Sequence, residues 1–447
     1  MAEAEGARTA AVGAWPAVAG SVLTPTPHRA ESLSDYREAG GYALLESSAN
    51  VHDELVRRPD VELLRGRGGA AFPFLAKVAS VRAAARGSDA EPCVVANGAE
   101  GEPLSVKDRY LMRHRPHLVL DGVALAAAAV GARTAYLYVS DDLSSHTLEQ
   151  AGRDAVSAGL ELPALEFVHA QDTFVAGEAS AAVRAITTRV ARPRDNVRRL
   201  STDGVAGAPT LVSNVETLGR LARAVMPTPC EGESPFLVTV SGSGSRPWLV
   251  EVPNDLAVGD LLDYLGLSTY DTSVLVGGFF GGILPVAGDL RISVSSMEEH
   301  GGALGCASLY VISSGEDPVA VGAAVARYYS DNNARQCRSC VNGTRAVADV
   351  LEGELTDVSR AVASLTRWSD QLVGRGACAV PDGVAVVLRS LLRHYPDRLH
   401  GWLTEQSFGP ARTPARWDHL TVGVPTPLPN DVTGSPTRGI TQLEVVS

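Results

Sequence analysis

The chain has 447 residues, of which 45% are hydrophobic and 20% charged. This is a globular composition with room for roughly two to four domains. Acidic residues outnumber basic residues by 51 to 39, and the formal net charge is -12. A surface of this sign repels nucleic acid and anionic lipid, so we expect no nucleic acid among the partners.

The N-terminus and the longest apolar stretch argue against a secreted or membrane-inserted protein. Residues 1–20 lack the basic region and the sustained apolar core of a signal peptide. The longest apolar stretch, residues 118–130, includes Asp121 and has roughly half the length that a bilayer crossing needs. We therefore expect a cytoplasmic protein with no direct membrane insertion.

The first half of the chain predicts an arm followed by an α/β domain. Residues 1–58 mix Pro, Ala and Gly around one helix-like piece at 36–51, so we expect an N-terminal arm. The elements expected next are a strand at 61–66, a glycine loop, a strand at 93–98, a helix from Leu118, a strand at 135–140, a helix from Ser145 and a strand at 165–170. This alternation predicts a parallel sheet in a domain over residues 59–230.

The second half predicts a small sheet domain, a helical bundle and a tail. Residues 235–300 read as two strands, a short helix at 258–265 and further strands, the last at 290–294, which is a β-grasp-like order. The glycines at 277–282 are better explained as tight turns than as a second phosphate loop. Apolar spacing then predicts helices at 318–330, 344–353, 357–373 and 382–395, in a bundle over residues 301–403. Residues 404–447 are rich in Pro and Thr without periodicity, which predicts a flexible tail.

A glycine cluster, GRGGAAFP at residues 66–73, has the composition of a phosphate-binding loop. Glycines let backbone N–H groups converge on an anion, and Arg67 and Lys77 add positive charge nearby. The cluster also fits a dinucleotide-binding fingerprint, but that pattern calls for an acidic residue at the end of the next strand, where this chain has Asn97. An ordinary flexible loop stays open as an alternative.

Polar residues crowd directly after the strand at 93–98. Open α/β sheets place ligands beyond the carboxyl ends of their strands. Apolar residues and glycines flank the segment on both sides, which favours a loop held against the sheet over a solvated charged loop. The residues concerned are Asn97, Glu100, Glu102, Lys107, Asp108 and Arg109.

Three cysteines gather in the helical third of the chain. Cys337 and Cys340 form a C-x-x-C pair, and Cys378 follows at a glycine-rich helix junction. Thiolates at this spacing select zinc or an iron–sulfur cluster. Three unligated buried cysteines are the alternative.

Several motifs, in order, resemble the NADH-binding flavoprotein subunit of respiratory complex I, a module also found in NAD-reducing hydrogenases and NAD-dependent formate dehydrogenases. The resemblance covers about residues 60–400. It rests on GRGGAAFP with Lys77, ANGAEGEP, KDRYLM, AGEASA at 176–181, GAPTLVSNVETL at 207–218 and the cysteines. It implies an FMN-binding α/β domain, a β-grasp insert of the soluble-ligand-binding (SLBB) type and a helical bundle with one [4Fe-4S] cluster.

The resemblance also implies the roles of single residues. FMN would lie across the loop formed by Gly66, Arg67, Gly68 and Gly69, with Lys77 near its phosphate or ribityl chain. The rest of that pocket would be lined by Asn97, Glu100, Gly177, Glu178, Asn214 and Thr217, and Glu102 matches a glutamate that helps to hold NADH. In the family, hydride passes from NADH to the flavin, and electrons leave singly through the cluster.

This chain departs from the family at three places. Ala334 stands where the family has the first cluster cysteine, so Cys337, Cys340 and Cys378 form an incomplete ligand set; Asp331, solvent or a partner's cysteine could complete it, or the cluster could hold three irons. Ala179 replaces a second glutamate that helps to hold NADH, and Ser80 replaces an aromatic residue beside the adenine. The family's basic segment is also altered around residues 196–200, whereas Phe72 is kept.

These observations favour an FMN and iron–sulfur oxidoreductase that takes electrons from NADH or another reduced donor. The acceptor would be a separate ferredoxin-like or thioredoxin-like [2Fe-2S] protein, because the chain contains no ferredoxin segment of its own. Two alternatives stay open: a non-catalytic scaffold of the same fold, and a flavoprotein with a zinc site in place of the cluster.

Overall fold

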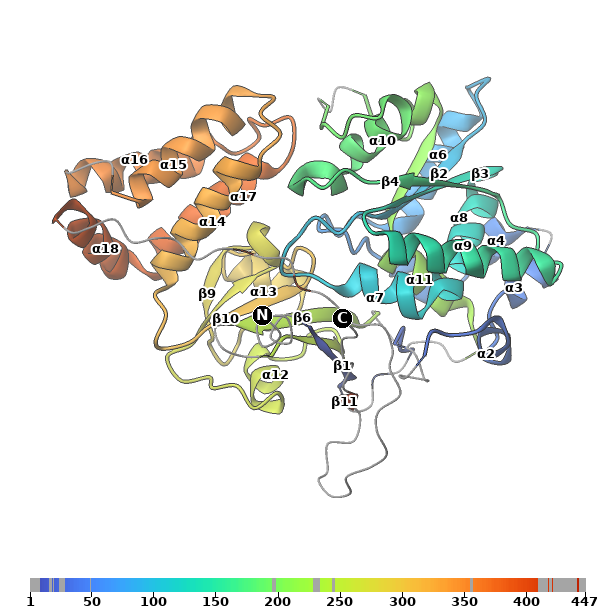
Figure 1. Ribbon diagram of the computed structural model, residues 1–447, viewed down its shortest axis with the longest axis horizontal. Helices are drawn as coiled ribbons and strands as arrows, with labels where there is room; N and C mark the ends of the chain where they lie inside the picture. The colour runs from blue at the N-terminus through green and yellow to red at the C-terminus, as the bar shows by residue number, and fades with distance from the viewer. Residues whose placement is uncertain are drawn as a thin grey trace, which may run out of the picture.

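The computed structural model describes residues 9–15, 18, 20–23, 29–48, 50–194, 198–227, 234–242, 246–353, 357–408, 417, 420 and 440–441. These residues form a parallel sheet with helices on both faces, a second, mixed sheet and a bundle of helices that lies apart from the first sheet (Figure 1).

The first sheet has four parallel strands in the order β4-β3-β2-β5. Its strands are β2 (Cys93–Gly98), β3 (Thr134–Val139), β4 (Ala164–His169) and β5 (Thr210–Asn214). The surrounding helices are α6 (Phe74–Ala85), α7 (Lys107–His114), α8 (Pro116–Val130), α9 (Asp142–Ser157), α10 (Ala179–Thr188) and α11 (Val215–Val225). The α/β domain with a parallel sheet is thus present as the sequence predicts.

Alternation along β2 explains why both faces of this sheet are covered. Val94 and Ala96 point into the core that α8 and α11 share, whereas Cys93 and Val95 point into the smaller core under α10. Helices α8 and α11 approach closely at Gly122, where a Cβ atom would lie 1.9 Å from the carbonyl oxygen of Leu218.

The strand predicted at 61–66 is wrong. Residues 59–62 form helix α5 (Pro59–Glu62), and Leu64 follows after a turn at Leu63. Pro59 sets the helical φ at the first position, and the buried Val61 and Leu64 are three residues apart, which is a helical spacing. Only an isolated bridge between Arg65 and Pro73 pairs this stretch, and it closes the glycine loop.

The second sheet has the order β11-β1-β7-β6-β10-β8-β9. Strands β6 (Phe236–Gly242) and β7 (Trp248–Val252) form a hairpin, helix α12 (Val258–Tyr264) follows, and β10 (Ser308–Ile312) lies parallel to β6 between it and β8 (Ser273–Val276). Strand β9 (Ile283–Pro285) pairs with β8. The strand predicted at 290–294 is instead a bend that leads into helix α13 (Val294–Glu299), because Ser293 caps that helix.

The N-terminal residues pair with the second sheet and pack against helices of the first sheet. Strand β1 (Ala11–Ala14) pairs with β7, and β11 (Ile440–Thr441) pairs with β1. The single helix expected at 36–51 is three short helices, α2 (Leu33–Glu38), α3 (Ala43–Ser47) and α4 (Val51–Val56). Gly40 has a φ of 93°, in the left-handed region that ends a helix. Tyr36 and Tyr42 are buried in the core around α8.

The helical bundle follows the predicted order, with one helix more. It contains α14 (Pro318–Asn332), α15 (Thr344–Leu351), α16 (Val358–Gln371), α17 (Val380–His394) and α18 (Pro396–Phe408). Helix α18 contradicts the predicted start of the tail at 404. Most of the predicted tail lies outside the described residues. No helix among the described residues is long and apolar enough to cross a membrane.

Candidate functional site

The glycine loop presents backbone donors at the edge of the first sheet. The Gly66 N–H donates to the carbonyl oxygen of Phe72 over 2.9 Å, and the Arg67 N–H donates to Thr217 Oγ1 over 2.8 Å. The next two residues, Gly68 and Gly69, are exposed, and their N–H groups have no acceptor among the described residues. Such a loop can bind an anion.

Lys77 lies on α6, which begins directly after the loop. Its Nζ donates to the carbonyl oxygen of Val212 in β5 over 3.3 Å, and no described carboxylate forms an ion pair with it. Burial lowers the pKa of Lys77. A half-buried cation beside a glycine loop, with one neutral partner, fits a phosphate group.

Two asparagines mark the carboxyl ends of the neighbouring strands β2 and β5. Asn97 and Asn214 are partners in the strand register, and Asn97 Nδ2 donates to the carbonyl oxygen of Gly177 over 2.8 Å. Gly68 reaches the same edge, since a Cβ atom there would lie 3.4 Å from Asn214 Cβ. Gly177 is needed for close packing, because a Cβ atom would lie 2.5 Å from the Ala99 carbonyl oxygen. The sheet edge, the glycine loop and the segment around Gly177 are thus in contact.

A buried network of charged side chains fixes the Asn214 amide through hydrogen bonds. Lys107 Nζ lies 2.7 Å from Asp108 Oδ1, 3.2 Å from Glu216 Oε2 and 3.1 Å from Asn214 Oδ1. Asn214 Nδ2 in turn donates to Asp108 Oδ2 over 2.7 Å. Burial alone would lower the pKa of Lys107, but the carboxylates raise it. Burial raises the pKa of Asp108, against the effect of Lys107. Lys77 and Lys107 are the two lysines of the chain, and both adjoin Asn214 or its strand.

Glu100 and Glu178 both cap helices. Glu100 accepts from the Asp108 N–H over 3.1 Å and the Arg109 N–H over 3.2 Å, at the start of α7. Glu178 accepts from the Ala181 N–H over 2.9 Å as the N-cap of α10. These bonds fix the loops that carry the two carboxylates. The two side chains therefore have structural roles.

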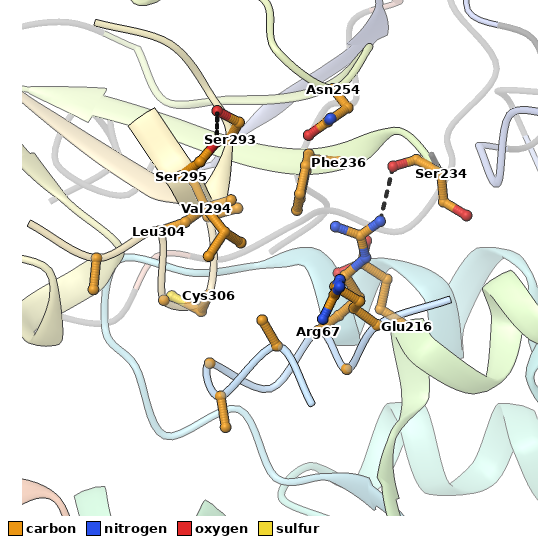
Figure 2. A pocket seen from close by; sticks show the side chains of 18 of the residues that line it. Arg67, Glu216, Ser234, Phe236, Asn254, Ser293, Val294, Ser295, Leu304 and Cys306 are labelled. Carbon is orange, nitrogen blue, oxygen red and sulfur yellow. Dashed lines mark hydrogen bonds between the residues drawn. The ribbon is translucent and has the colours of Figure 1, made fainter. Parts of the chain in front are cut away.

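Arg67 points away from the sheet edge and toward the second sheet (Figure 2). Its Nη2 donates to the Ser234 carbonyl oxygen over 2.8 Å, and its guanidinium lies 3.8 Å from the centre of the Phe236 ring. A cleft of about 760 Å³ separates the loop from the second sheet and α13. Of the predicted site residues, the cleft is lined by Gly66, Arg67 and Gly69.

Glu102 lies against the glycine turn between β8 and β9. Its Oε1 accepts from the Phe279 N–H over 2.9 Å, and burial raises its pKa to about 8. Gly278 has a φ of 70°, and its lack of a side chain makes room for the carboxylate. The glycines at 277–282 form a tight turn here, as the sequence favours.

The structure also describes two of the positions that depart from the family pattern, Ala179 and Ser80. Ala179 is the first residue of α10, directly after Glu178. Ser80 Oγ lies 2.8 Å from Ser201 Oγ, so a hydroxyl pair occupies the place expected for an aromatic ring. Phe72 is 49% exposed on the glycine loop. Residues 196 and 197 of the altered segment lie outside the described residues.

The three cysteines lie at adjoining ends of the bundle helices. Cys340 Sγ accepts from the N–H groups of Gln336 over 3.2 Å and Cys337 over 3.3 Å. Ser339 Oγ donates to the Arg375 carbonyl oxygen over 3.0 Å, which ties this turn to the loop before Cys378. Burial would raise the pKa of Cys337, but backbone N–H groups, first that of Ala377, lower it. Burial raises the pKa of Cys378 to about 11. N–H groups directed at sulfur are the surroundings that an iron–sulfur cluster uses.

Within the described ranges, no three His, Cys, Asp or Glu side chains are close enough to hold one metal ion. An iron–sulfur cluster is larger than a single ion, and its ligands stand further apart. Ala334 is partly buried against the bundle core, and Asp331 is exposed.

Two protein-family models match this chain, one over the first sheet with its helices and one over the helical bundle. A family model described as the Nuo51 FMN-binding domain matches residues 61–223, and one described as the NADH-ubiquinone oxidoreductase-F iron-sulfur binding region matches residues 320–401. The chain belongs to the 51 kDa flavoprotein family of complex I and NAD-reducing hydrogenases. The members of this family are oxidoreductases of the NADH dehydrogenase type.

Its relatives are distant but similar over most of their length. The chain is 28% identical over 390 residues to the mitochondrial NADH dehydrogenase [ubiquinone] flavoprotein 1 of Dictyostelium discoideum. The aligned residues make up 78% of this chain and 79% of that protein. It is 26% identical over 394 residues to the mitochondrial NADH-ubiquinone oxidoreductase 51 kDa subunit of Aspergillus niger, covering 80% and 78%. The crystal structure of NAD⁺-reducing [NiFe]-hydrogenase in the H2-reduced state matches with a TM-score of 0.69 and 26% identity, over 84% of this chain and 67% of that one.

Sequence reasoning missed how this flavoprotein connects its site to the second sheet. Glu216 and Glu251 both bind the fully buried Arg220, and Glu251 also accepts from the Val22 N–H over 3.1 Å. The network of charged side chains that fixes Asn214 thus continues into β7 and the N-terminal arm. The available signal was Arg220 itself, a charge between apolar residues on α11.

Proposed function

We propose that this flavoprotein binds FMN at the carboxyl ends of β2 and β5 and passes electrons from NADH to an iron–sulfur cluster and then to a [2Fe-2S] partner. The observation that carries the proposal is Lys77, a half-buried cation without a described carboxylate partner, next to a glycine loop whose N–H groups at Gly68 and Gly69 have no described acceptor. This donor set suits the phosphate of a flavin nucleotide, whose isoalloxazine, when bound, accepts hydride and releases electrons one at a time.

Each predicted residue has a role in this proposal. Gly66, Gly68 and Gly69 offer backbone donors, and Thr217 holds the loop through the Arg67 N–H. Asn97 and Asn214 offer amides at the sheet edge, and the ion pair of Lys107 and Asp108 fixes Asn214. Glu100, Gly177 and Glu178 would line the side of the FMN pocket that faces away from the glycine loop. Arg67 contributes backbone rather than charge, because its guanidinium is held by Ser234 and Phe236.

The proposed NADH site is weaker than the flavin site. Glu102 would take a hydroxyl of the dinucleotide, but its carboxylate already accepts from Phe279, and burial raises its pKa to about 8. Ala179 offers no second carboxylate, and Ser80 is paired with Ser201. Another reduced donor therefore remains part of the proposal.

We propose that Cys337, Cys340 and Cys378 hold a [4Fe-4S]-type cluster with one iron left without a cysteine. Ala334, the position of the missing ligand, precedes the turn and has no donor atom in its side chain. The support is chemical: three thiols at adjoining helix ends, with N–H groups directed at two of the sulfurs. Such a cluster is more easily lost than one with four cysteines.

Domain boundaries, partner and location complete the proposal. Residues 59–230 would form the FMN-binding domain and 235–300 the β-grasp-like SLBB domain. The cluster-binding bundle, expected over 301–403, would extend through α18 to Phe408, and the arm would occupy 1–58. The strand order β7-β6-β10-β8, with β6 and β10 parallel, supports the β-grasp assignment. A ferredoxin-like or thioredoxin-like protein would accept the electrons in the cytoplasm.

The test is an anaerobic visible spectrum before and after NADH, with flavin and iron quantified on the same sample. We expect flavin and cluster bands that bleach with NADH. Bands that persist with NADH but bleach with dithionite would assign another donor. A preparation that contains neither flavin nor iron would overturn the proposal and favour a scaffold.

A further inference from the structure

A patch of arginines and valines surrounds the cysteine turn. It consists of Arg335, Arg338, Val341, Val373 and Arg375, and we call it the arginine–valine patch. All five side chains are exposed, with Val341 at 45% and Val373 at 41%. Large apolar side chains at this exposure are few among the described residues. Two of them beside one group of thiols indicate a surface that another molecule covers.

The patch comes from two segments that the structure holds together. Ser339 Oγ donates to the Arg375 carbonyl oxygen over 3.0 Å, and the Ala377 N–H is directed at the Cys337 sulfur. Gly343, after Val341, lies against Leu372, where a Cβ atom would be 2.6 Å from Leu372 Cδ2. The arginines and valines therefore adjoin the thiols from both sides.

The three arginines carry uncompensated charge. No ion pair joins Arg335, Arg338 or Arg375 to a carboxylate in the part of the chain that the structure describes, whereas Arg389 of the same bundle pairs with Asp370 over 2.8 Å. Of the flanking acids, Asp331 is exposed on α14, and Asp382 accepts from the Gly374 N–H over 2.8 Å. A positive patch of this kind attracts a negatively charged surface on a partner.

The backbone of Arg335 adds a second indication. Its φ of 49° lies in the left-handed region, which residues other than glycine seldom adopt. The Arg335 N–H donates to Asn333 Oδ1 over 2.9 Å, and Asn333 Nδ2 donates to the Cys340 carbonyl oxygen over 3.1 Å. The turn thus holds a strained arginine at the exposed side of the thiols, and such strain concentrates at functional sites.

We infer that the arginine–valine patch is the docking surface for a small acidic iron–sulfur electron carrier. The inference rests on the proposed function, because the cysteines must hold a redox centre for docking here to be useful. Encounters of electron carriers bury little area and depend on charge for orientation. The two valines supply an apolar centre, and the arginines supply a polar rim.

The experiment measures binding of the holoprotein to a plant-type [2Fe-2S] ferredoxin of net negative charge by calorimetry. We expect the affinity to fall more than about tenfold between about 20 and about 300 mM salt. The double variant R338E/R375E should lose more than about tenfold at low salt, and R338Q/R375Q should lose less. The control R86E/R153E makes the same change of charge at the end of α6 and on α9, in the other domain, and should bind nearly as wild type.

Flavin content, iron content and circular dichroism are measured on each variant, so that a misfolded or empty protein is recognised. If R338E/R375E does not fold, R338Q/R375Q serves in its place. Salt-independent binding, an equal loss in R86E/R153E, or no binding of the ferredoxin by a loaded protein that bleaches with NADH would overturn the inference and leave the proposed function standing. A preparation without cofactors would instead count against the proposed function.

Discussion

The Nζ atom of Lys77 lies 3.3 Å from the carbonyl oxygen of Val212, which joins the helix after the glycine loop to the strand that ends in Asn214. This contact places a cation at the sheet edge without a described carboxylate to neutralise it. Burial lowers the pKa of Lys77, so a larger share of this amine is neutral near physiological pH than of an ordinary lysine amine.

Lys77 should therefore react selectively with amine acylation reagents at a pH of about 8, well below the ordinary lysine pKa of about 10.4. Lys107 is the built-in control, because it is 2% exposed and its neighbouring carboxylates raise its pKa. We expect mass spectrometry of the apoprotein to show acylation at Lys77 and little at Lys107. Added FMN should slow the reaction at Lys77 by about tenfold or more, because a bound phosphate covers the amine and its negative charge favours the protonated, unreactive form. Equal rates with and without FMN would place the phosphate elsewhere.

Restoring a carboxylate at position 179 should improve NADH binding. Ala179 is the first residue of α10, where a negative side chain is favourable for the helix as well. Because charge-assisted hydrogen bonds contribute about 1.5 to 3 kcal/mol, we expect A179E to lower the KM for NADH by about tenfold or more. Flavin content should stay unchanged.

The matched control for A179E is A179Q, which has the same length without the charge and should keep most of the wild-type KM. Steady-state rates with ferricyanide as acceptor give the comparison. If A179E and A179Q behave alike, the carboxylate is not what the chain lacks for NADH recognition.

A cysteine at position 334 should stabilise the cluster. A334C supplies the missing fourth thiol, and we expect loss of iron to a chelator to slow by about tenfold or more, by analogy with the effect of supporting groups on metal affinity. The readout is iron release followed by absorbance under anaerobic conditions. A334S is the control, because a hydroxyl of the same size is a poor iron ligand. Identical release rates in wild type, A334S and A334C would mean that Ala334 does not face the cluster.

The sequence predicts what depends on local spacing. The parallel strands and four bundle helices follow from apolar periodicity, and the motif residues of the loop and of the cysteine turn are adjacent in the chain. Helix α18 carried the same signal, since Leu399, Trp402 and Leu403 are spaced as one helical face after Pro396, but the polar residues between them obscured it. The helix at 59–62 could not be recognised from the sequence, because four residues are too few to show a helical period.

Contacts between distant segments could not be predicted in this way. Lys77 meets Val212 over 135 residues, Asn97 meets Gly177 over 80, and the Arg67 guanidinium reaches Ser234 over 167. A pattern of neighbouring residues carries no information about contacts between residues so far apart in the sequence. These contacts hold the Arg67 side chain against Ser234 and leave Lys77 without a described carboxylate partner.

Asp121 should make the protein less stable as the pH rises from about 4 to about 6. The carboxylate is 1% exposed, and burial raises its pKa from 3.8 to about 6. The folded state therefore binds this proton more tightly than the unfolded state, and the free energy of unfolding falls across this window by about 3 kcal/mol, at 1.36 kcal/mol for each pKa unit. D121N removes the ionisation. It can keep both known bonds, because the Tyr36 hydroxyl and the Tyr42 N–H both donate to Oδ2.

Urea unfolding of wild type and D121N, followed at several pH values by fluorescence, isolates this effect, because other titrating groups contribute equally to both proteins. We expect the wild-type midpoint to fall relative to that of D121N between pH about 4 and about 6, and the difference to stay constant above. D121N has its own cost, since the amide nitrogen replaces Oδ1, which has no partner among the described residues. That cost is independent of pH and shifts the whole curve, so a constant difference across the window would show that Asp121 stays ionised in the folded protein.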